Sequence, residues 1–232
     1  MSAKIVALLP MKANSERVKG KNFRDFNGKP LFRWILDALL AVPEIDEVVI
    51  NTDARSILAA NGLVDTDRIR IRDRKPEICG DFVSMNLVLA DDVANLGADI
   101  YLMTHTTNPL MSPDTIRAAL SAYQQAVAKG SADSLFTVDK VQTRFYRADC
   151  SPVNHDPDNL VRTQDLEPWF EENSNLYIFS GASFGATQAR IGKSPMMFET
   201  PRFESIDIDD QDDWELALVA SRYLQEKEGG KS

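Results

Sequence analysis

Residues 5–22 read IVALLPMKANSERVKGKN, an apolar run followed at once by a polar and basic one. Residues 5–9 are apolar without interruption, which is typical of a strand that helices cover on both faces, as in a parallel sheet. The run is shorter than the roughly 7–15 apolar residues of a secretion signal. We therefore interpret it as a buried first strand, with residues 10–22 forming the loop at its carboxyl end.

Further apolar runs of β type follow along the chain, and helical patterns separate them. We expect strands at residues 5–9, 47–51, 69–71, 100–103, 135–138 and 176–179. Helices are expected after Pro30, over 83–94, behind the cap at 112–113 and over 214–224. Strands that alternate with helices form crossover units, so the pattern predicts an α/β protein with a mostly parallel sheet. Because ligands of such sheets bind beyond the carboxyl ends of the strands, the loops after residues 9, 51 and 103 are the expected places for chemistry.

The composition is that of a globular protein with an acidic overall charge. Among 232 residues, 26 Lys and Arg stand against 35 Asp and Glu, for a net charge of −9. This length suits a single domain over residues 1–232. The acidic balance argues against nucleic acid as a partner, and no apolar run reaches the roughly 20 residues that cross a membrane. Cys79 and Cys150 stand alone, which disfavours a structural zinc site. We expect a cytoplasmic protein.

Residues 139–175 break the alternation of strands and helices. They are rich in Pro, Asp, Asn and Arg, with aromatic residues at Phe145, Tyr146, Trp169 and Phe170. A linker or disordered loop is one interpretation. The aromatic residues favour an ordered excursion that packs on a second subunit.

The loop over residues 10–22 concentrates positive charge in an acidic protein. It holds four cations, which are Lys12, Arg17, Lys19 and Lys21, with a hydroxyl at Ser15. Lysine, serine hydroxyl and backbone N–H groups are what a polyphosphate needs. The loop matches neither the P-loop nor the dinucleotide pattern. A solvated basic loop is the alternative interpretation.

Two further segments carry polar groups suited to a ligand. Alternation in an extended segment puts Asp207 and Asp209 on one side, where two carboxylates are natural ligands for Mg²⁺. An acidic helix cap is the alternative, and it explains residues 209–213 but not Asp207. Residues 104–110, THTTNPL, follow directly after a buried strand and include His105. They form either a binding surface for a polyhydroxylated ligand or a plain loop.

Taken in order, these segments resemble the CMP-sialic acid synthetases, or acylneuraminate cytidylyltransferases, and more loosely the CMP-Kdo synthetases. Residues 11–22 are similar to the family pattern A-R-x-x-S-K-x-x-x-x-K-N at Ser15, Lys21 and Asn22. Other similar stretches are NGKPL at 27–31, NTD at 51–53, RKPE at 74–77 with Asp81 and Ser84, NSNLY at 173–177 and DID at 207–209. The ordered set covers nearly the whole chain.

The resemblance implies a three-layer α/β/α sandwich of the nucleotide-diphospho-sugar transferase type, acting as a homodimer through the 139–175 excursion. It implies a reaction in which CTP and a 2-keto sugar acid give a CMP-sugar and pyrophosphate, with Mg²⁺ as cofactor. The implied catalytic residues are Lys12, Lys21 and Asp209, and the implied metal ligands are Asp207 and Asp209. The implied nucleotide-binding residues are Lys12, Ser15, Arg17, Lys21, Asn22, Arg74 and Ser84. The implied substrate-binding residues are His105, Asn173 and Tyr177.

The departures from the family pattern lie mainly on the sugar side. His105 stands for the family's Gln, Met111 for its Arg, and Glu171–Glu172 for its Arg-Pro. On the phosphate side, Lys12 replaces Arg and Glu16 replaces the first Lys. Two alternatives follow: a cytidylyltransferase for Kdo, legionaminic, pseudaminic or a related acid, and a non-catalytic nucleotide-binding module on the same fold.

Overall fold

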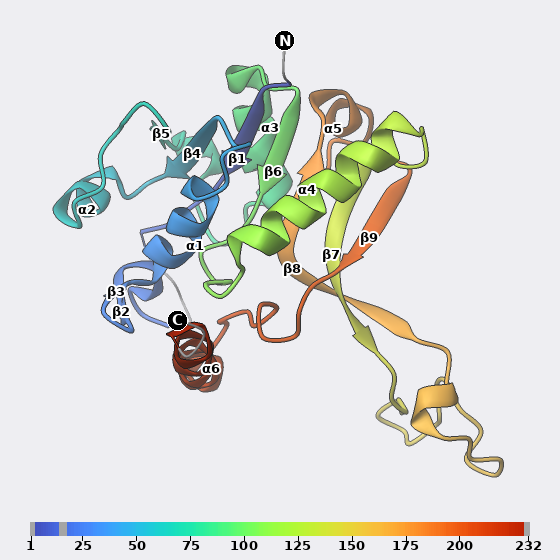
Figure 1. Ribbon diagram of the computed structural model, residues 1–232. Helices are drawn as coiled ribbons and strands as arrows, with labels where there is room; N and C mark the ends of the chain where they lie inside the picture. Colours follow the sequence, from blue (N-terminus) through green and yellow to red (C-terminus); the bar gives the residue numbers. More distant parts are fainter. Residues whose placement is uncertain (1–2, 14–17, 230–232) are drawn as a thin grey trace.

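The computed structural model describes residues 3–13 and 18–229, which form a seven-stranded sheet with helices on both faces (Figure 1). The strand order is β5 (Ile69–Asp73), β4 (Glu47–Thr52), β1 (Ile5–Leu8), β6 (Ile100–Met103), β8 (Trp169–Phe179), β7 (Ser134–Val141) and β9 (Pro195–Glu199). Among the described strands of this sheet, only β8 runs antiparallel to its neighbours, β6 and β7. The mostly parallel sheet expected from the sequence is confirmed.

The two faces of the sheet are covered because the side chains of each strand alternate between them. Ile5 and Ala7 of β1 pack with α1 (Leu31–Leu40) and α4 (Pro113–Ala128) in one apolar cluster. Val6 and Leu8 pack with α3 (Met85–Leu96) and α5 (Gly181–Thr187) in another. This gives the three-layer sandwich. Six-residue α2 (Arg55–Ala60) follows β4.

A third apolar cluster lies beyond the carboxyl ends of the parallel strands, where α6 (Gln211–Gly229) packs (Figure 1). Trp214 of α6 meets Phe26 of the short hairpin made by β2 (Asp25–Phe26) and β3 (Lys29–Pro30), with ring centroids 5.4 Å apart. Val18 and Ile208 are buried in the same cluster. This cluster therefore joins the basic loop to the acidic segment before α6. The short 3-10 helices are η1 (Lys21–Phe23), η2 (Pro76–Ile78) and η3 (Thr163–Asp165).

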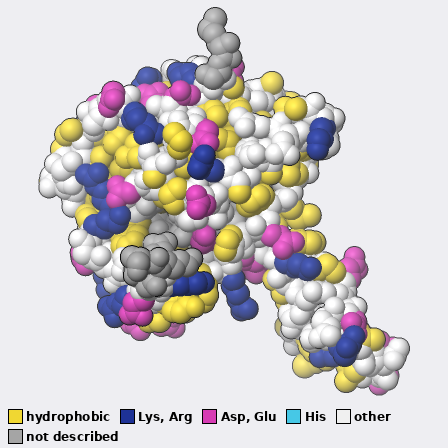
Figure 2. Space-filling model, in the orientation of Figure 1, with side chains coloured by type: hydrophobic (Ala, Val, Ile, Leu, Met, Phe, Trp, Pro, Cys, Tyr) yellow, Lys and Arg dark blue, Asp and Glu magenta, His cyan; other side chains and the backbone are white. Residues whose placement is uncertain are grey.

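The excursion is ordered, and it stands away from the body of the molecule (Figures 1 and 2). Strands β7 and β8 are longer than expected and include residues 139–141 and 169–175. We name the remaining connection, residues 142–168, the arm. Phe145 of the arm stacks on Trp169 with ring centroids 5.0 Å apart, so the aromatic residues do hold it together.

Several elements were not expected from the sequence, namely β2, β3, α2, α5 and β9. Strand β9 has the sequence PMMFE, and three of its five residues are exposed, so its pattern carries little apolar signal. Among the described helices, none is both long and apolar enough to cross a membrane.

Candidate active site

The basic loop begins as a continuation of β1 along β4. The Met11 amide donates to the Asn51 carbonyl at 3.0 Å, and the Ala13 amide donates to Asp53 Oδ1 at 2.7 Å. Lys12 forms an ion pair of 2.9 Å with Asp81, and both side chains are about two-fifths exposed. At the far end of the loop, Gly20 adopts a left-handed conformation with φ of 63°, which non-glycine residues rarely adopt. Ser15, Arg17 and Glu16 lie outside the described residues.

Lys21 and Asn22 follow that turn and point inward, and both are buried. Lys21 Nζ donates to the Ile208 carbonyl, between Asp207 and Asp209. Asn22 donates from Nδ2 to the Lys12 carbonyl at 2.9 Å and accepts at Oδ1 from Thr106 at 2.7 Å. The structure thus brings together the basic loop, the acidic segment and the loop after β6.

The carboxylates of the acidic segment differ in their roles. Asp210 Oδ1 accepts from the amides of Asp212 and Asp213 at the start of α6, and Asp213 accepts from the Asp209 amide. These contacts are those of a helix cap. The Asp207 carboxylate takes no part in them. Its Oδ1 is buried and accepts no hydrogen bond within the described chain.

The electrostatics of Asp207 fit a metal ligand. Burial raises its pKa, a nearby hydrogen bond from Thr107 lowers it, and the charge of Asp209 raises it further. A buried carboxylate oxygen without a donor and a second carboxylate close by suit Mg²⁺, which prefers oxygen ligands. Among the described residues, no group of three His, Cys, Asp or Glu side chains could hold a metal alone. Mg²⁺ commonly completes its shell with water and substrate phosphates, so two carboxylates suffice.

Arg74 and Ser84, expected to contact the nucleoside, have roles in the protein itself. Arg74 is buried and donates from Nε to Asn51 Oδ1 at 3.0 Å and from Nη2 to the Asn51 carbonyl at 2.8 Å. Burial lowers the pKa of Arg74. Asn51 also donates to the buried Asp92 at 2.8 Å. Ser84 caps α3 by accepting from the Asn86 amide at 3.3 Å.

Arg190, which the sequence did not reveal, lies against His105 and Tyr177, two residues expected to bind the sugar. Its guanidinium carbon lies 3.8 Å from the centre of the Tyr177 ring. Its Nη1 is 3.5 Å from His105 Nε2, and its Nη2 is 3.7 Å from Glu172 Oε1. Tyr177 Oη donates to Glu172, and burial, followed by this bond, raises the pKa of Tyr177 to about 12. Asn173 instead donates to Thr200 Oγ1 at 2.7 Å and ties β8 to the segment after β9.

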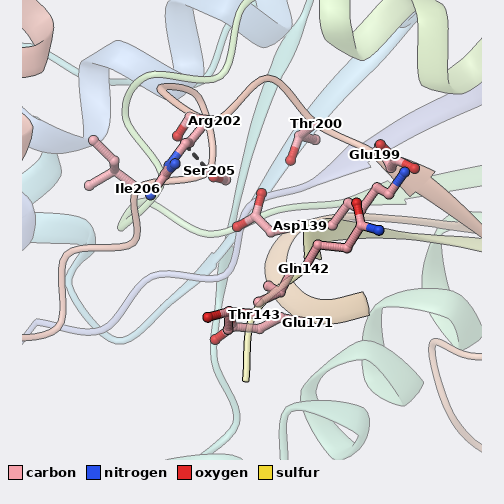
Figure 3. Close-up of a pocket in the computed structure, with 11 residues that line it drawn as sticks. Asp139, Gln142, Thr143, Glu171, Glu199, Thr200, Arg202, Ser205 and Ile206 are labelled. Carbon is pink, nitrogen blue, oxygen red and sulfur yellow. Dashed lines mark hydrogen bonds between the residues drawn. The ribbon is translucent and has the colours of Figure 1, made fainter. Parts of the chain in front are cut away.

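Two adjoining hollows extend from Asp207 and Asp209 to the base of the arm. One, of about 260 Å³, is lined by Asp139, Glu171, Glu172, Asn173, Ser174, Ser205, Asp207 and Asp209. The other, of about 590 Å³, shares Asp139, Glu171 and Ser205 with the first. Figure 3 shows the labelled side chains of this second hollow, which come from β7, the start of the arm, β8, β9 and the segment that follows β9. A ligand of sugar size can therefore lie next to Asp207 and Asp209.

His105 should make folding stability depend on pH. Burial and then the charges of Arg190 and Lys21 lower its pKa from 6.5 to about 3. Below pH 6.5, His105 binds a proton in the unfolded chain but stays unprotonated in the folded protein. The free energy of unfolding therefore falls as the pH falls. Relative to His105→Gln, wild type should lose about 2 kcal/mol of unfolding free energy between pH 7.5 and pH 5. Urea denaturation at both pH values measures this. A difference that does not change with pH would show that His105 has the same pKa in the folded and the unfolded protein.

A profile of the family described as cytidylyltransferase matches residues 6–215. The chain belongs to the cytidylyltransferase family, as its resemblance indicated. It is 28% identical to the CMP-N,N'-diacetyllegionaminic acid synthase of Legionella pneumophila over 96% of this chain and 98% of that one. It is 27% identical to the N-acylneuraminate cytidylyltransferase of Oncorhynchus mykiss over 92% of this chain, but only 49% of that protein is covered.

The fold is shared with solved structures of low sequence identity. CMP:2-keto-3-deoxy-manno-octonic acid synthetase complexed with CTP has a TM-score of 0.62 at 16% identity, with 97% of this chain and 100% of that chain covered. At this identity the likeness concerns the fold alone. It agrees with the α/β sandwich described above.

Proposed function

We propose that this protein activates a 2-keto sugar acid of the nonulosonic class with CTP, giving a CMP-sugar and pyrophosphate. One observation supports this above all: Lys21 of the basic loop donates to the backbone between Asp207 and Asp209. A phosphate-binding cation and a carboxylate pair thus meet at the carboxyl end of the sheet. They do so in a chain of the cytidylyltransferase family.

In the proposed reaction the anomeric hydroxyl oxygen of the sugar acid forms a bond to the α-phosphorus of CTP. The bond from the α-phosphorus to the bridging oxygen breaks, pyrophosphate leaves with that oxygen, and the hydroxyl proton goes to solvent. Lys12 and Lys21 lie where they can neutralise the departing pyrophosphate, and such positioning and charge neutralisation make up most of the catalysis of phosphoryl transfer. Asp207 and Asp209 would hold Mg²⁺, which supplies charge neutralisation at phosphate oxygens when bound.

For the nucleoside we propose contacts from Asn22, Arg74 and Ser84. Arg74 and Asn22 both contact the start of the basic loop, since Arg74 Nη2 reaches the Met11 carbonyl at 3.4 Å and Asn22 donates to the Lys12 carbonyl at 2.9 Å. Asn22 and Arg74 already donate to backbone carbonyls of Lys12 and Asn51. Their first role is therefore to hold the backbone beside the proposed nucleoside site in place. Ser15 and Arg17 remain proposed phosphate ligands.

We further infer a homodimer in the cytoplasm, built from one domain with the arm as its contact. The arm exposes apolar side chains, among them Tyr146, Leu160 and Val161, and aromatic Trp169 and Phe170 are partly exposed beside it. Exposed apolar groups that gather on a projecting segment are typical of a subunit contact. The proposed substrate CTP is a cytoplasmic nucleotide.

The function is tested by pyrophosphate release from CTP, UTP, ATP and GTP with a panel of 2-keto sugar acids. We expect CTP to be strongly preferred. We expect N-acetylneuraminic acid to be a poor substrate beside a modified nonulosonic acid, because His105 presents its polar groups on a shorter, rigid ring than Gln. Equal use of UTP would contradict the proposed base contacts. No release with any acid would favour a binding module, and preference for N-acetylneuraminic acid would show that His105 does not set the choice.

A further inference from the structure

We propose that Arg190 binds the carboxylate of the sugar acid and so determines which acids the enzyme accepts. This inference rests on the function proposed above. It concerns a residue 85 positions from His105 that no motif of the chain marks.

Arg190 adjoins a residue that lines the hollow beside Asp207 and Asp209. Its guanidinium contacts Glu172, which lines that hollow together with Asp207 and Asp209. It also contacts His105. The charge of Lys21 lowers the pKa of both His105 and Asp207, so these two residues lie near Lys21. Arg190 is thus part of the same group of side chains as the proposed phosphate and metal ligands. The attacking hydroxyl and the carboxylate of a 2-keto sugar acid are both attached to its anomeric carbon, so the two groups must bind close together.

The segment that carries Arg190 is held rigidly. Helix α5 ends at Thr187, and Gln188, which caps it, adopts a left-handed conformation with φ of 55°. The Thr187 hydroxyl then contacts the Ala189 and Ile191 carbonyls at 3.2 Å each, and the Arg190 amide donates to Asn86 Oδ1 at 3.3 Å.

Just beyond Arg190 the chain is fastened to the start of β7. The Gly192 amide donates to Ser134 Oγ at 2.8 Å, and the Lys193 amide donates to Asp133 Oδ2 at 2.8 Å. A Cβ at Gly192 would lie 2.2 Å from Asp133 Oδ1, so only glycine permits this close approach. A binding group on a segment fixed from both sides needs little ordering when the ligand arrives.

The guanidinium of Arg190 is positioned but not closely bonded. It lies over the face of the Tyr177 ring, and this leaves the N–H groups at the edge of the planar guanidinium directed away from the ring centre. Its two contacts along that edge are long: 3.5 Å to His105 and 3.7 Å to Glu172. A hydrogen bond between nitrogen and oxygen is normally close to 2.9 Å. The N–H groups of Arg190 are therefore held in place, but their contacts with His105 and Glu172 are weak.

The neighbours favour a carboxylate over a neutral ligand group. Burial and the charges of Arg190 and Lys21 lower the pKa of His105, so its ring is neutral. Arg190 and Lys21 thus supply two positive charges near a neutral ring. The planar fork of arginine matches the two oxygens of a carboxylate, and Glu172 already presents one such group to it.

The test compares two ligands and four proteins, which are wild type, Arg190→Met, Arg190→Lys and a control variant. The ligands are the best acid of the panel and its C1 carboxamide, and their dissociation constants are measured calorimetrically with a CTP analogue whose α,β bridge cannot be cleaved. For Arg190→Met we expect the acid to bind about ten- to a hundredfold more weakly, since hydrogen bonds to charged groups contribute this much. Binding of the carboxamide and the KM for CTP should hardly change. Arg190→Lys should recover part of the affinity for the acid.

Arg117→Met is the matched control. Arg117 is a half-exposed arginine of α4 that pairs with Glu44 away from the site, so its loss should leave both ligands unaffected. Equal weakening of acid and carboxamide by Arg190→Met would overturn the inference and leave Arg190 only a support for Tyr177. Unchanged binding of the acid would also overturn it. If wild type turns over no acid in the panel, the proposed function has failed, and this outcome is distinct from both.

Discussion

Asp209→Asn is expected to lower the rate of pyrophosphate release about a thousandfold while the protein stays folded. The change removes one of two carboxylates proposed to hold Mg²⁺, and metal stabilisation of phosphoryl charge is worth several kcal/mol. Asp209 is exposed, so an asparagine of the same size opens no cavity and buries no new polar group. Steady-state rates over a titration with Mg²⁺, after treatment with EDTA, measure the effect, and circular dichroism checks the fold.

Asp210→Asn is the control for this result. Asp210 stands next to Asp209 but accepts from amides at the start of α6, so its loss should cost roughly 1 kcal/mol of stability and little activity. If Asp209→Asn keeps wild-type activity at every Mg²⁺ concentration, Asp209 holds no catalytic metal and the proposed metal site is wrong.

Lys21→Met is expected to lower kcat about a hundredfold or more, the cost of removing one charged group aimed at developing negative charge. Lys21 is buried, and its Nζ donates to the Ile208 carbonyl, between the proposed metal ligands Asp207 and Asp209. Methionine retains the aliphatic stem and much of the packing. Single-turnover rates with saturating CTP separate this loss from weaker nucleotide binding.

The chain offers Lys19 as a matched control for Lys21. Lys19 lies in the same loop with its side chain exposed, and Lys19→Met should retain most of the activity. Equal losses in both variants would indicate that the loop acts through its overall positive charge, and that Lys21 has no special role.

Much of the fold could be predicted because the strands carry a strong local signal. Residues 5–8 and 100–103 are buried on both faces of the sheet, and such continuous apolar runs are visible in the sequence. Strand β9 could not be predicted, because at the edge of the sheet it is half exposed. The length of β8 was missed because residues 169–172 are exposed outside the body and have no apolar alternation.

The active site was predictable only where its residues lie in a recognisable order. Lys21 and Asp207 belong to motifs, and the structure places them together. Arg190 has no motif, and only the meeting of β8, α5 and the loop after β6 puts it beside His105. The two acids at 171–172, where the resemblance led us to expect an arginine, were the available signal that a cation had to come from elsewhere. In space, Arg190 is the cation beside Glu172.

The third apolar cluster has a bearing on which inherited changes this protein can tolerate. Its members, including Val18, Ile208 and Trp214, hold α6 on the body, and they are separate from the two clusters that hold the sheet. Parts of a protein that pack separately can open separately. Damage to this small cluster would therefore pull the cationic loop from the carboxylates and leave the sheet intact. Such a protein would keep its sheet but lose its activity, so these apolar residues are as necessary for function as the lysines and aspartates that they hold together.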